Sequence, residues 1–262
     1  MKHSTLLGLF LLLYLFPLAQ KRDISGIWYS VDQEVIVIGD TSGRLENLMQ
    51  GGQDFAKINV SKNKISFLKQ YYSSATNYEI LYTDKYEFKI LNHNDSILEL
   101  LPISSFSKVF FQNRGKIKFK KKEYWQSENL HFDKIFFHSS ECFGHCPLID
   151  YEINSKGFVK YKFGGWAADS SKRGHFVGQM PDSTYLLFQR ILKNCQLETL
   201  RWNSTRCCDG VVVTLIIFFN NERKYIKSML PSIVTDDLLN FFYTLDSKMN
   251  FTITDQKFYM QE

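Results

Sequence analysis

The residue types with the greatest chemical potential lie in one short segment, Cys142-Phe143-Gly144-His145-Cys146-Pro147. Two thiols four positions apart around a glycine can form a disulfide, bind a soft metal ion or cycle between reduced and oxidised states. His145 lies between them, and His138 or His175 could complete a copper or zinc site with the two sulfurs. Because oxidised cysteines do not bind metal, the redox state of the pair decides between these functions.

The N-terminal segment predicts export. Met1-Lys2-His3 gives a positively charged start, the run from Leu6 to Leu15 is almost wholly apolar, and Ala19 offers a small residue for cleavage. This apolar run of about ten residues is shorter than the roughly 20 that a helix needs to cross a bilayer. We therefore expect a signal peptide over residues 1–19, a secreted or periplasmic protein and no transmembrane span.

All five cysteines lie in the C-terminal half, and an exported protein favours pairing them. A turn between Cys142 and Cys146 can bring their Cα atoms within the roughly 4.4 to 6.8 Å that a disulfide requires. Loop entropy favours a longer bridge from Cys142 to Cys207 or Cys208, at about 4 kcal/mol against about 2. Proximity favours the short bridge. We predict a structural Cys142–Cys146 disulfide, and a second bridge from Cys195 to Cys207 or Cys208.

Composition and charge indicate two folded domains. The chain is 262 residues long, 44% hydrophobic and 16% aromatic, which is enough for two cores, and its net charge is +5. The densest basic cluster, Lys116 to Lys122, predicts a linker over residues 116–131, with lysines that discourage strand pairing. The same lysines could bind an anionic envelope surface. The export signal, and the lack of a reader motif, argue against nucleic acid.

Residues 20–115 predict an antiparallel β domain. Short runs of β-branched and aromatic residues alternate with turn residues, as in a meander that closes on itself. The predicted strands are Glu34 to Ile38, Phe55 to Val60, Lys64 to Leu68, Tyr78 to Tyr82, Tyr86 to Leu91 and Lys108 to Phe111.

The start and end of this domain resemble lipocalin-like barrels. Gly26-Ile27-Trp28 matches their opening Gly-x-Trp signature, and Arg114 follows the final predicted strand, where those barrels often place an arginine over the tryptophan. The resemblance implies a lipocalin-like β-barrel in which Arg114 covers Trp28, a cation–π contact of roughly 0.5 to 2 kcal/mol. It also implies either a barrel that holds a small apolar ligand or one filled by its own side chains.

Residues 132–250 predict an α+β domain with an antiparallel sheet and two helices, followed by a C-terminal tail over residues 251–262. Phe132 to His138 is a predicted strand, the alternation around Asn154 to Gly157 predicts a hairpin, and Val211 to Phe219 is a predicted central strand. Apolar stripes at helical spacing predict two helices that pack on the sheet. The stripes are Phe188, Ile191, Leu192 and Cys195, and Leu238, Phe241, Phe242 and Leu245.

The stretch from about Phe132 to Met249 resembles a secreted bacterial family, the domain of unknown function 6438 family, whose hallmark is Cys-Phe-Gly-x-Cys-Pro followed by a hairpin. The family has no established activity, so the resemblance bears on fold and export and implies no mechanism. Cys195, Cys207 and Cys208 depart from its usual form. The matching positions are Cys142, Phe143, Gly144, Cys146, Pro147, Tyr151, Gly157, the helix from Asp182, and Asp209.

No catalytic motif of comparable specificity occurs in the sequence, and Asp209, Asp236 and Asp237 fit turn and capping positions. Cys-x-x-x-Cys-Pro also resembles the copper loop of Sco-type metallochaperones, but those proteins need a helix directly after the motif, where a hairpin is predicted here. We expect an exported, non-enzymatic binding or envelope-associated protein without a cofactor. The alternative is a thiol-dependent copper, zinc or redox protein that uses Cys142, His145 and Cys146.

Overall fold

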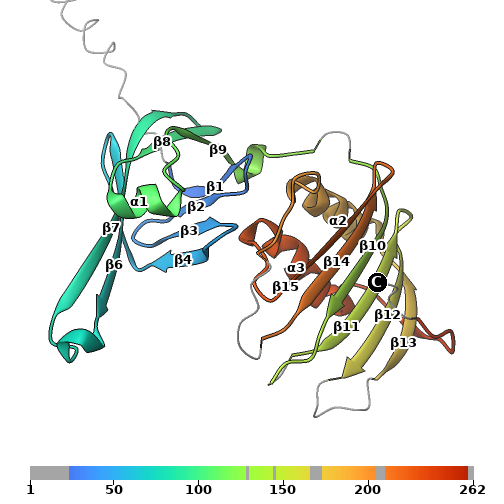
Figure 1. Cartoon of the computed structure of the whole chain (residues 1–262). Helices are drawn as coiled ribbons and strands as arrows, with labels where there is room; N and C mark the ends of the chain where they lie inside the picture. Colours follow the sequence, from blue (N-terminus) through green and yellow to red (C-terminus); the bar gives the residue numbers. More distant parts are fainter. Residues whose placement is uncertain (1–23, 128–129, 144–145, 166–172, 204–209, 259–262) are drawn as a thin grey trace, which may run out of the picture.

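The computed structural model describes residues 24–127, 130–143, 146–165, 173–203 and 210–258. The predicted signal peptide, Gly144, His145, Cys207, Cys208 and Asp209 lie outside these ranges. Figure 1 shows a β-rich protein of two domains that lie side by side, a barrel-like domain and an α+β domain. No helix in the described ranges is long and apolar enough to cross a membrane.

The first domain is a nearly closed antiparallel barrel, which confirms the predicted β-rich fold. Its sheet has the order β4-β3-β2-β1-β9-β8-β7-β6-β5, so the two edge strands, β4 and β5, are neighbours in the chain. The Ile58 amide on β5 donates to the Thr41 carbonyl at 2.8 Å, which ties the edge strand β5 to the β2–β3 turn across the opening of the barrel. The elements are β1 (Gly26–Ser30), β2 (Val35–Ile38), β3 (Gly43–Asn47), β4 (Gly51–Phe55), β5 (Lys57–Val60), β6 (Lys64–Tyr72), β7 (Leu81–His93), β8 (Ile97–Pro102), α1 (Ser105–Phe110) and β9 (Ile117–Lys121).

Side chains fill the barrel interior. Trp28 is fully buried there and donates through Nε1 to the Ile24 carbonyl at 2.9 Å. Phe67 and Phe88 meet edge to face with ring centroids 5.9 Å apart, and Phe111 packs on Phe88 at 5.5 Å. Of the two forms of barrel implied by the lipocalin-like resemblance, this arrangement corresponds to the one filled by its own side chains.

Of the predicted strands of this domain, Lys108 to Phe111 is wrong and Tyr78 to Tyr82 is wrong in part. Lys108 to Phe111 belongs to the end of α1 and its cap, because Ser104 accepts a hydrogen bond from the Ser107 amide and starts a helix across one end of the barrel. Tyr78 has a φ of 62° and lies in a turn, so β7 begins only at Leu81. A four-residue apolar run has no period that separates helix from strand.

The predicted basic linker over residues 116–131 is also wrong over its first part, which is β9, a strand between β1 and β8. Ile117 and Phe119 point into the barrel, with 1% and 0% of their surface exposed, while Lys118 points to solvent. The alternation has period two, as in any half-buried strand. The lysines on the outward face gave this strand the composition of a linker, although it completes the barrel sheet between β1 and β8.

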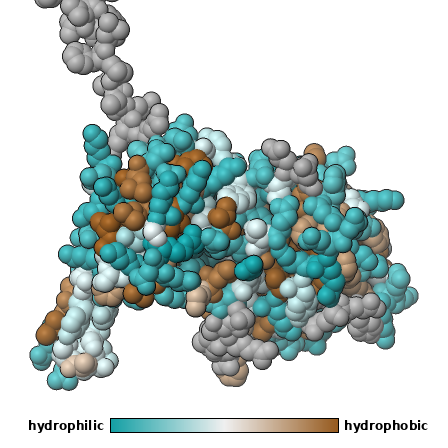
Figure 2. Space-filling model, turned by 45° about the horizontal axis from the view of Figure 1, so that its top comes forward, coloured by the Kyte–Doolittle hydropathy of each residue, from teal (hydrophilic) through white to brown (hydrophobic). Residues whose placement is uncertain are grey.

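The far part of the β6–β7 hairpin projects from the barrel (Figure 1). In Figure 2 this projection is mostly pale, with an apolar patch along its outer side. Tyr72, Ile80 and Leu81 are each about half exposed there, and Tyr78 is 65% exposed.

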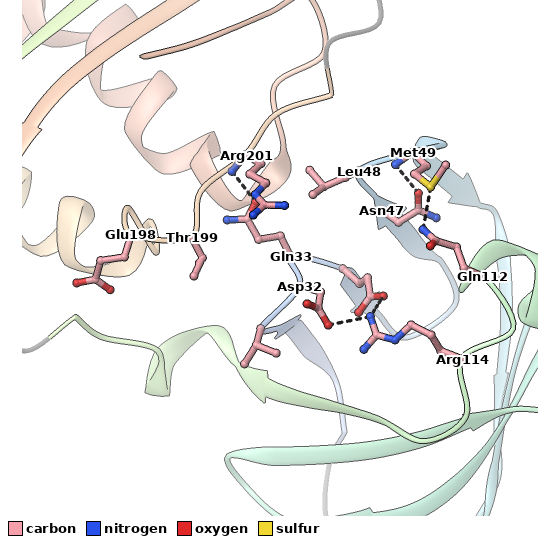
Figure 3. A pocket seen from close by; sticks show the side chains of 12 residues that line it. Asp32, Gln33, Asn47, Leu48, Met49, Gln112, Arg114, Glu198, Thr199 and Arg201 are labelled. Carbon is pink, nitrogen blue, oxygen red and sulfur yellow. Dashed lines mark hydrogen bonds and ion pairs between the residues drawn. The ribbon is translucent and has the colours of Figure 1, made fainter. Parts of the chain in front are cut away.

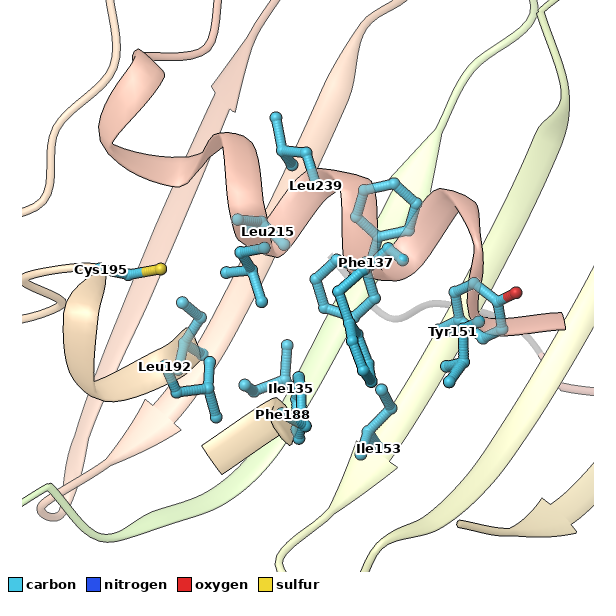
Figure 4. Close-up of a cluster of buried hydrophobic side chains, with 14 of the residues drawn as sticks. Ile135, Phe137, Tyr151, Ile153, Phe188, Leu192, Cys195, Leu215 and Leu239 are labelled. Atoms are coloured by element: carbon cyan, nitrogen blue, oxygen red, sulfur yellow. The ribbon is translucent and has the colours of Figure 1, made fainter. Parts of the chain in front are cut away.

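The second domain confirms the predicted α+β arrangement. Its sheet has the order β15-β14-β10-β11-β12-β13-β16, and α2 and α3 pack on one face. Figure 4 shows the core between helices and sheet, where Phe137 stacks on Phe242 at 4.4 Å. The elements are β10 (Phe132–Ser139), β11 (Leu148–Asn154), β12 (Phe158–Gly165), β13 (Gly174–Gln179), α2 (Asp182–Asn194), β14 (Val213–Phe219), β15 (Glu222–Ser228), α3 (Asp236–Tyr243) and β16 (Thr252–Ile253).

The predicted C-terminal tail over residues 251–262 packs on the sheet where the structure describes it. β16 pairs with β13, and Phe258 is buried on the sheet face opposite the helices, with its ring stacked 6.4 Å from Phe136. Phe136 of β10 and Ile216 of β14 make this face apolar, and Phe258 shields them from solvent.

The two domains share a packed junction. Tyr29 of β1 and Val35 of β2 are fully buried within the core cluster of the α+β domain. Glu46 of β3 accepts hydrogen bonds from the Ser232 hydroxyl at 2.5 Å and the Ile233 amide at 3.2 Å. One turn and one strand of the barrel are therefore fixed against the second domain.

The position of β9 can be tested with Phe119→Ala. Removing a fully buried ring from the barrel should lower the free energy of unfolding by about 3 to 5 kcal/mol. Lys118→Ala, on the outward face of the same strand, should change it by less than about 0.5 kcal/mol. Equilibrium urea unfolding measures both. Equal effects of the two substitutions would contradict the placement of residues 116–122 in the barrel.

Candidate functional site

Cys142 and Cys146 are joined by a disulfide in the connection between β10 and β11, with their Cα atoms 5.5 Å apart. Phe143 lies between them and is 92% exposed. Pro147 follows Cys146 and leads directly into β11. A bridged pair has no thiolate to offer a metal ion, so in this state the two cysteines act as a structural link.

The structure does not bring the predicted metal ligands together in the part of the chain that it describes. His138 Nδ1 lies 2.6 Å from Asp150 Oδ1, and His175 Nδ1 accepts a hydrogen bond from the Phe258 amide at 3.1 Å. His138 is on β10 and His175 on β13, with two strands between them. No group of three or more His, Cys, Asp or Glu side chains in the described ranges could hold a metal ion.

His138 instead belongs to a polar row on the sheet face opposite the helices. The strand registers place Thr214, His138, Asp150 and Lys162 side by side on four neighbouring strands. Asp150 is 4% exposed, and its second carboxylate oxygen lies 3.1 Å from Lys162 Nζ. Burial raises the pKa of Asp150, but the hydrogen bonds and charges of His138 and Lys162 outweigh it and hold the pKa below its ordinary value. The row orients the His138 imidazole.

The predicted disulfide from Cys195 is wrong. Cys195 is a free thiol with 1% of its surface exposed, and its Sγ donates to the Ile191 carbonyl at 3.2 Å. It lies at the end of α2 on the face that packs into the core, as Figure 4 shows. Burial raises the pKa of this thiol to about 12. Its helical stripe position predicted the burial, and a buried thiol in an apolar core needs no partner.

The predicted contact of Arg114 with Trp28 is wrong as well. The cation over the Trp28 ring is Lys121, whose Nζ lies 5.6 Å from the ring centroid, because the β1–β9 register places these two residues opposite each other. Arg114 Nη1 instead lies 2.9 Å from Asp32 and 2.5 Å from Glu34. Arg114 thus contributes to a different site.

That site is a cleft of about 660 Å³ between the two domains, shown in Figure 3. The barrel contributes its β1–β2 turn (residues 31–34), its β3–β4 turn (residues 47–49), Gln112 and Arg114. The α+β domain contributes Glu198, Thr199 and Arg201 from the segment after α2. Ligand pockets occur preferentially at domain interfaces such as this one.

Side chains of the cleft are held by one another. Gln33 is 2% exposed and accepts a hydrogen bond through Oε1 from the Arg201 amide at 2.7 Å, which links the two walls. Asn47 Oδ1 accepts from the Met49 amide at 2.9 Å, and Gln112 Nε2 donates to Met49 Sδ. The Nε2 donor of Gln33 is buried and has no hydrogen-bond partner in the described ranges. A buried donor without a partner is costly and is often found where a ligand or water completes the site.

Glu34 is the buried carboxylate of the cleft. Burial raises its pKa, and the hydrogen bond from Ser30 and the charge of Arg114 only partly offset this. The Ser30 hydroxyl lies 2.5 Å from Glu34 Oε2. A titratable group whose pKa is perturbed by burial and by a specific charge, in a cleft, is typical of a functional site.

The lysines of residues 116–122 have contacts within the protein. Lys116 pairs with Glu99 at 3.0 Å, Lys120 lies over the Trp125 ring, and Lys122 pairs with Asp237 of α3 at 2.6 Å. Lys118 is exposed. These contacts have a structural role, and binding of an anionic envelope surface by this cluster stays a prediction.

Sequence reasoning missed the cleft and the polar row. The cleft residues come from four separate segments of the chain, and no motif links them. A signal for the row existed in the alternation of Asp150 and Lys162 along the predicted hairpin, because both fall on the face that does not carry Tyr151 and Tyr161. Comparisons with protein-family models, curated proteins and solved structures find no match to this chain. The functional assignment therefore depends on the site geometry alone.

The thiol states can be tested by alkylation of unreduced protein. Native protein should leave Cys195 unmodified, because it is buried and its pKa is about 12, whereas denatured protein should be alkylated there. Peptide mapping should recover Cys142 and Cys146 joined to each other. A Cys195 peptide bridged to Cys207 or Cys208, or a native Cys142 that is alkylated, would show that this arrangement of sulfurs is wrong.

The polar row can be tested with Asp150→Asn. At pH 7 the substitution should lower the free energy of unfolding by about 1 to 3 kcal/mol, since the carboxylate accepts two hydrogen bonds from charged or polar groups. The folded-state pKa of Asp150 is lowered, so its contribution is present above the unfolded pKa of about 3.9 and is lost as the pH falls through the folded value.

The difference between wild type and Asp150→Asn should therefore shrink below about pH 4, measured by urea unfolding across pH. Glu152→Gln is the matched control on the same strand and face. Its two lysine partners, Lys134 and Lys160, both lie at 3.4 Å, so a smaller loss is expected. A difference for Asp150→Asn that grows as the pH falls would contradict the assignment.

Proposed function

We propose that this protein is an exported, non-enzymatic binding protein whose ligand occupies the cleft between the barrel and the α+β domain. The observation that carries the proposal is the cleft itself, about 660 Å³ in volume, with both domains in its walls and a buried amide donor, Gln33 Nε2, without a partner. The proposal of export depends on the N-terminal segment, whose charge and apolar run are typical of a signal peptide.

The lining of the cleft favours a polar ligand. Asp32 and Glu34 already share the charge of Arg114, so neither carboxylate needs a cation from outside. Gln33 Nε2 is a donor without a partner, and the Thr199 hydroxyl, which donates to the Gln196 carbonyl at 3.4 Å, has an oxygen that can accept a hydrogen bond. A ligand with hydrogen-bonding groups on several sides, neutral or weakly charged, fits these walls better than an apolar one.

The alternative, a thiol-dependent metal or redox protein, has less support. The Cys142–Cys146 bridge removes both thiolates, and β11, which follows Pro147, is paired on both sides within the sheet. Cys195, the free thiol of the described ranges, is buried and has a raised pKa, so it does not supply a reactive thiolate.

Ligand binding can be tested with a panel of neutral sugars, polyols, nucleosides and polar amino acids, scored by the rise in melting temperature of the full chain. Thr199→Val and Arg201→Gln remove polar groups from one wall and should weaken binding of the ligand found by at least about tenfold, or 1.4 kcal/mol, by calorimetry.

Arg190→Gln, on an exposed position of α2, is the control and should leave the affinity unchanged. Circular dichroism and the melting temperature of each free variant check that it folds. Equal affinity in wild type and in both cleft variants would place the ligand elsewhere and refute the proposal.

A further inference from the structure

A second cavity, of about 410 Å³, lies within the α+β domain next to the disulfide loop. Pro147, which follows Cys146, forms part of its wall. The cavity lies on the helix side of the sheet, between β12, β13 and β16 and the residues that follow α3. It shares no lining residue with the interdomain cleft, so the two sites are independent.

Five aromatic residues line this cavity. Tyr161 and Phe163 come from β12, Phe176 from β13, and Tyr243 and Phe251 from the segments on either side of residue 246. Tyr161 lies 5.5 Å from Phe176 and 5.0 Å from Phe251, centroid to centroid. Rings that pack on each other in this way are fixed in place, and they offer a rigid apolar wall to a ligand.

The position of Phe251 depends on a glycine. A Cβ added at Gly178 of β13 would lie 2.6 Å from the Asn250 carbonyl oxygen and 3.3 Å from the Phe251 ring. The absence of a side chain lets the chain after α3 approach the sheet. The aromatic wall is therefore a built feature of the fold.

Two opposite charges, Arg173 and Asp246, also line this cavity. The Arg173 side chain lies directly over Gly165, since a Cβ added there would be 2.5 Å from Arg173 Nε, and Gly165 has a φ of +103° that favours glycine. Asp246 lies close enough to Tyr161 that, after burial, its negative charge raises the pKa of that hydroxyl. Arg173 and Asp246 are both exposed, so they place a cation and an anion at the mouth of the cavity, next to its aromatic wall.

We propose that this pocket binds a small zwitterion with an apolar body, that is, an apolar or aromatic α-amino acid. Its carboxylate pairs with Arg173, its ammonium group with Asp246, and its side chain packs on the aromatic rings. An ammonium group is also attracted to the faces of tyrosine and phenylalanine rings. A purely apolar ligand would pair with neither of the exposed charges at the mouth, and a purely polar one would leave the five rings uncovered by apolar surface.

The test measures binding of matched probes to the full chain by calorimetry. L-phenylalanine carries all three features, N-acetyl-L-phenylalanine lacks the ammonium charge, phenethylamine lacks the carboxylate, and glycine lacks the apolar body. L-phenylalanine should bind at least tenfold more tightly than each of the other three. Equal affinities for L-phenylalanine and the two single-charge probes, or no binding of L-phenylalanine and L-leucine at millimolar concentration, would overturn the proposal.

Single substitutions assign the two charges. Arg173→Gln should weaken the binding of L-phenylalanine and N-acetyl-L-phenylalanine at least tenfold and leave the binding of phenethylamine unchanged. Asp246→Asn should weaken the binding of L-phenylalanine and phenethylamine at least tenfold and leave the binding of N-acetyl-L-phenylalanine unchanged. Lys193→Gln on α2 is an exposed control that should change none of the affinities. Loss of binding for all probes in both variants would also count against the proposal, provided that melting temperatures show both to be folded.

Failure here is distinguishable from failure of the proposed function. Thr199 and Arg201 line the other cavity, so Thr199→Val and Arg201→Gln should leave the binding of L-phenylalanine unchanged. If those two variants lost it, the amino acid would be a ligand of the interdomain cleft and not of the aromatic pocket.

Discussion

The burial of Tyr29 and Val35 in the core of the α+β domain is the interaction on which the rest of the structure depends. These residues flank the β1–β2 turn, so the turn that carries Asp32, Gln33 and Glu34 is fixed against the second domain. Burying two such side chains contributes on the order of 3 to 6 kcal/mol to the junction. Without it, the barrel would be a separate body and the interdomain cleft would have only one wall.

Much of the fold follows from local patterns, and the failures have a common physical cause. Alternation along residues 148–163 and the apolar stripes of α2 and α3 predicted their elements, because each buries one face. β9 was missed because lysine can hold its charge in water while its hydrocarbon stem lies along a barrel, so a basic strand resembles a linker. Short apolar runs such as Lys108 to Phe111 take their conformation from the cap and the packing around them.

Less of the candidate site was accessible from sequence. The cysteine pair was predicted, since four residues around a glycine suffice for a bridge, and local geometry decides it. Arg114 and Glu34 are 80 positions apart, and only the closure of the barrel brings them together. The rings of the aromatic pocket likewise come from two strands and from the segments after α3, and each alone is an ordinary core residue. Long-range pairing of this kind leaves no short motif in a single sequence.

The packed junction has a consequence for how a ligand reaches the cleft. Proteins that capture ligands between domains often close around a hinge, and the rate of closure then limits capture. Here the hydrogen bonds of Gln33 to Arg201 and of Glu46 to Ser232 hold both walls at a set separation. The cleft is therefore preformed and needs no domain closure before a ligand binds. Molecules should therefore associate at a pace governed by diffusion and orientation, with the selection among them made by how slowly the matching one escapes.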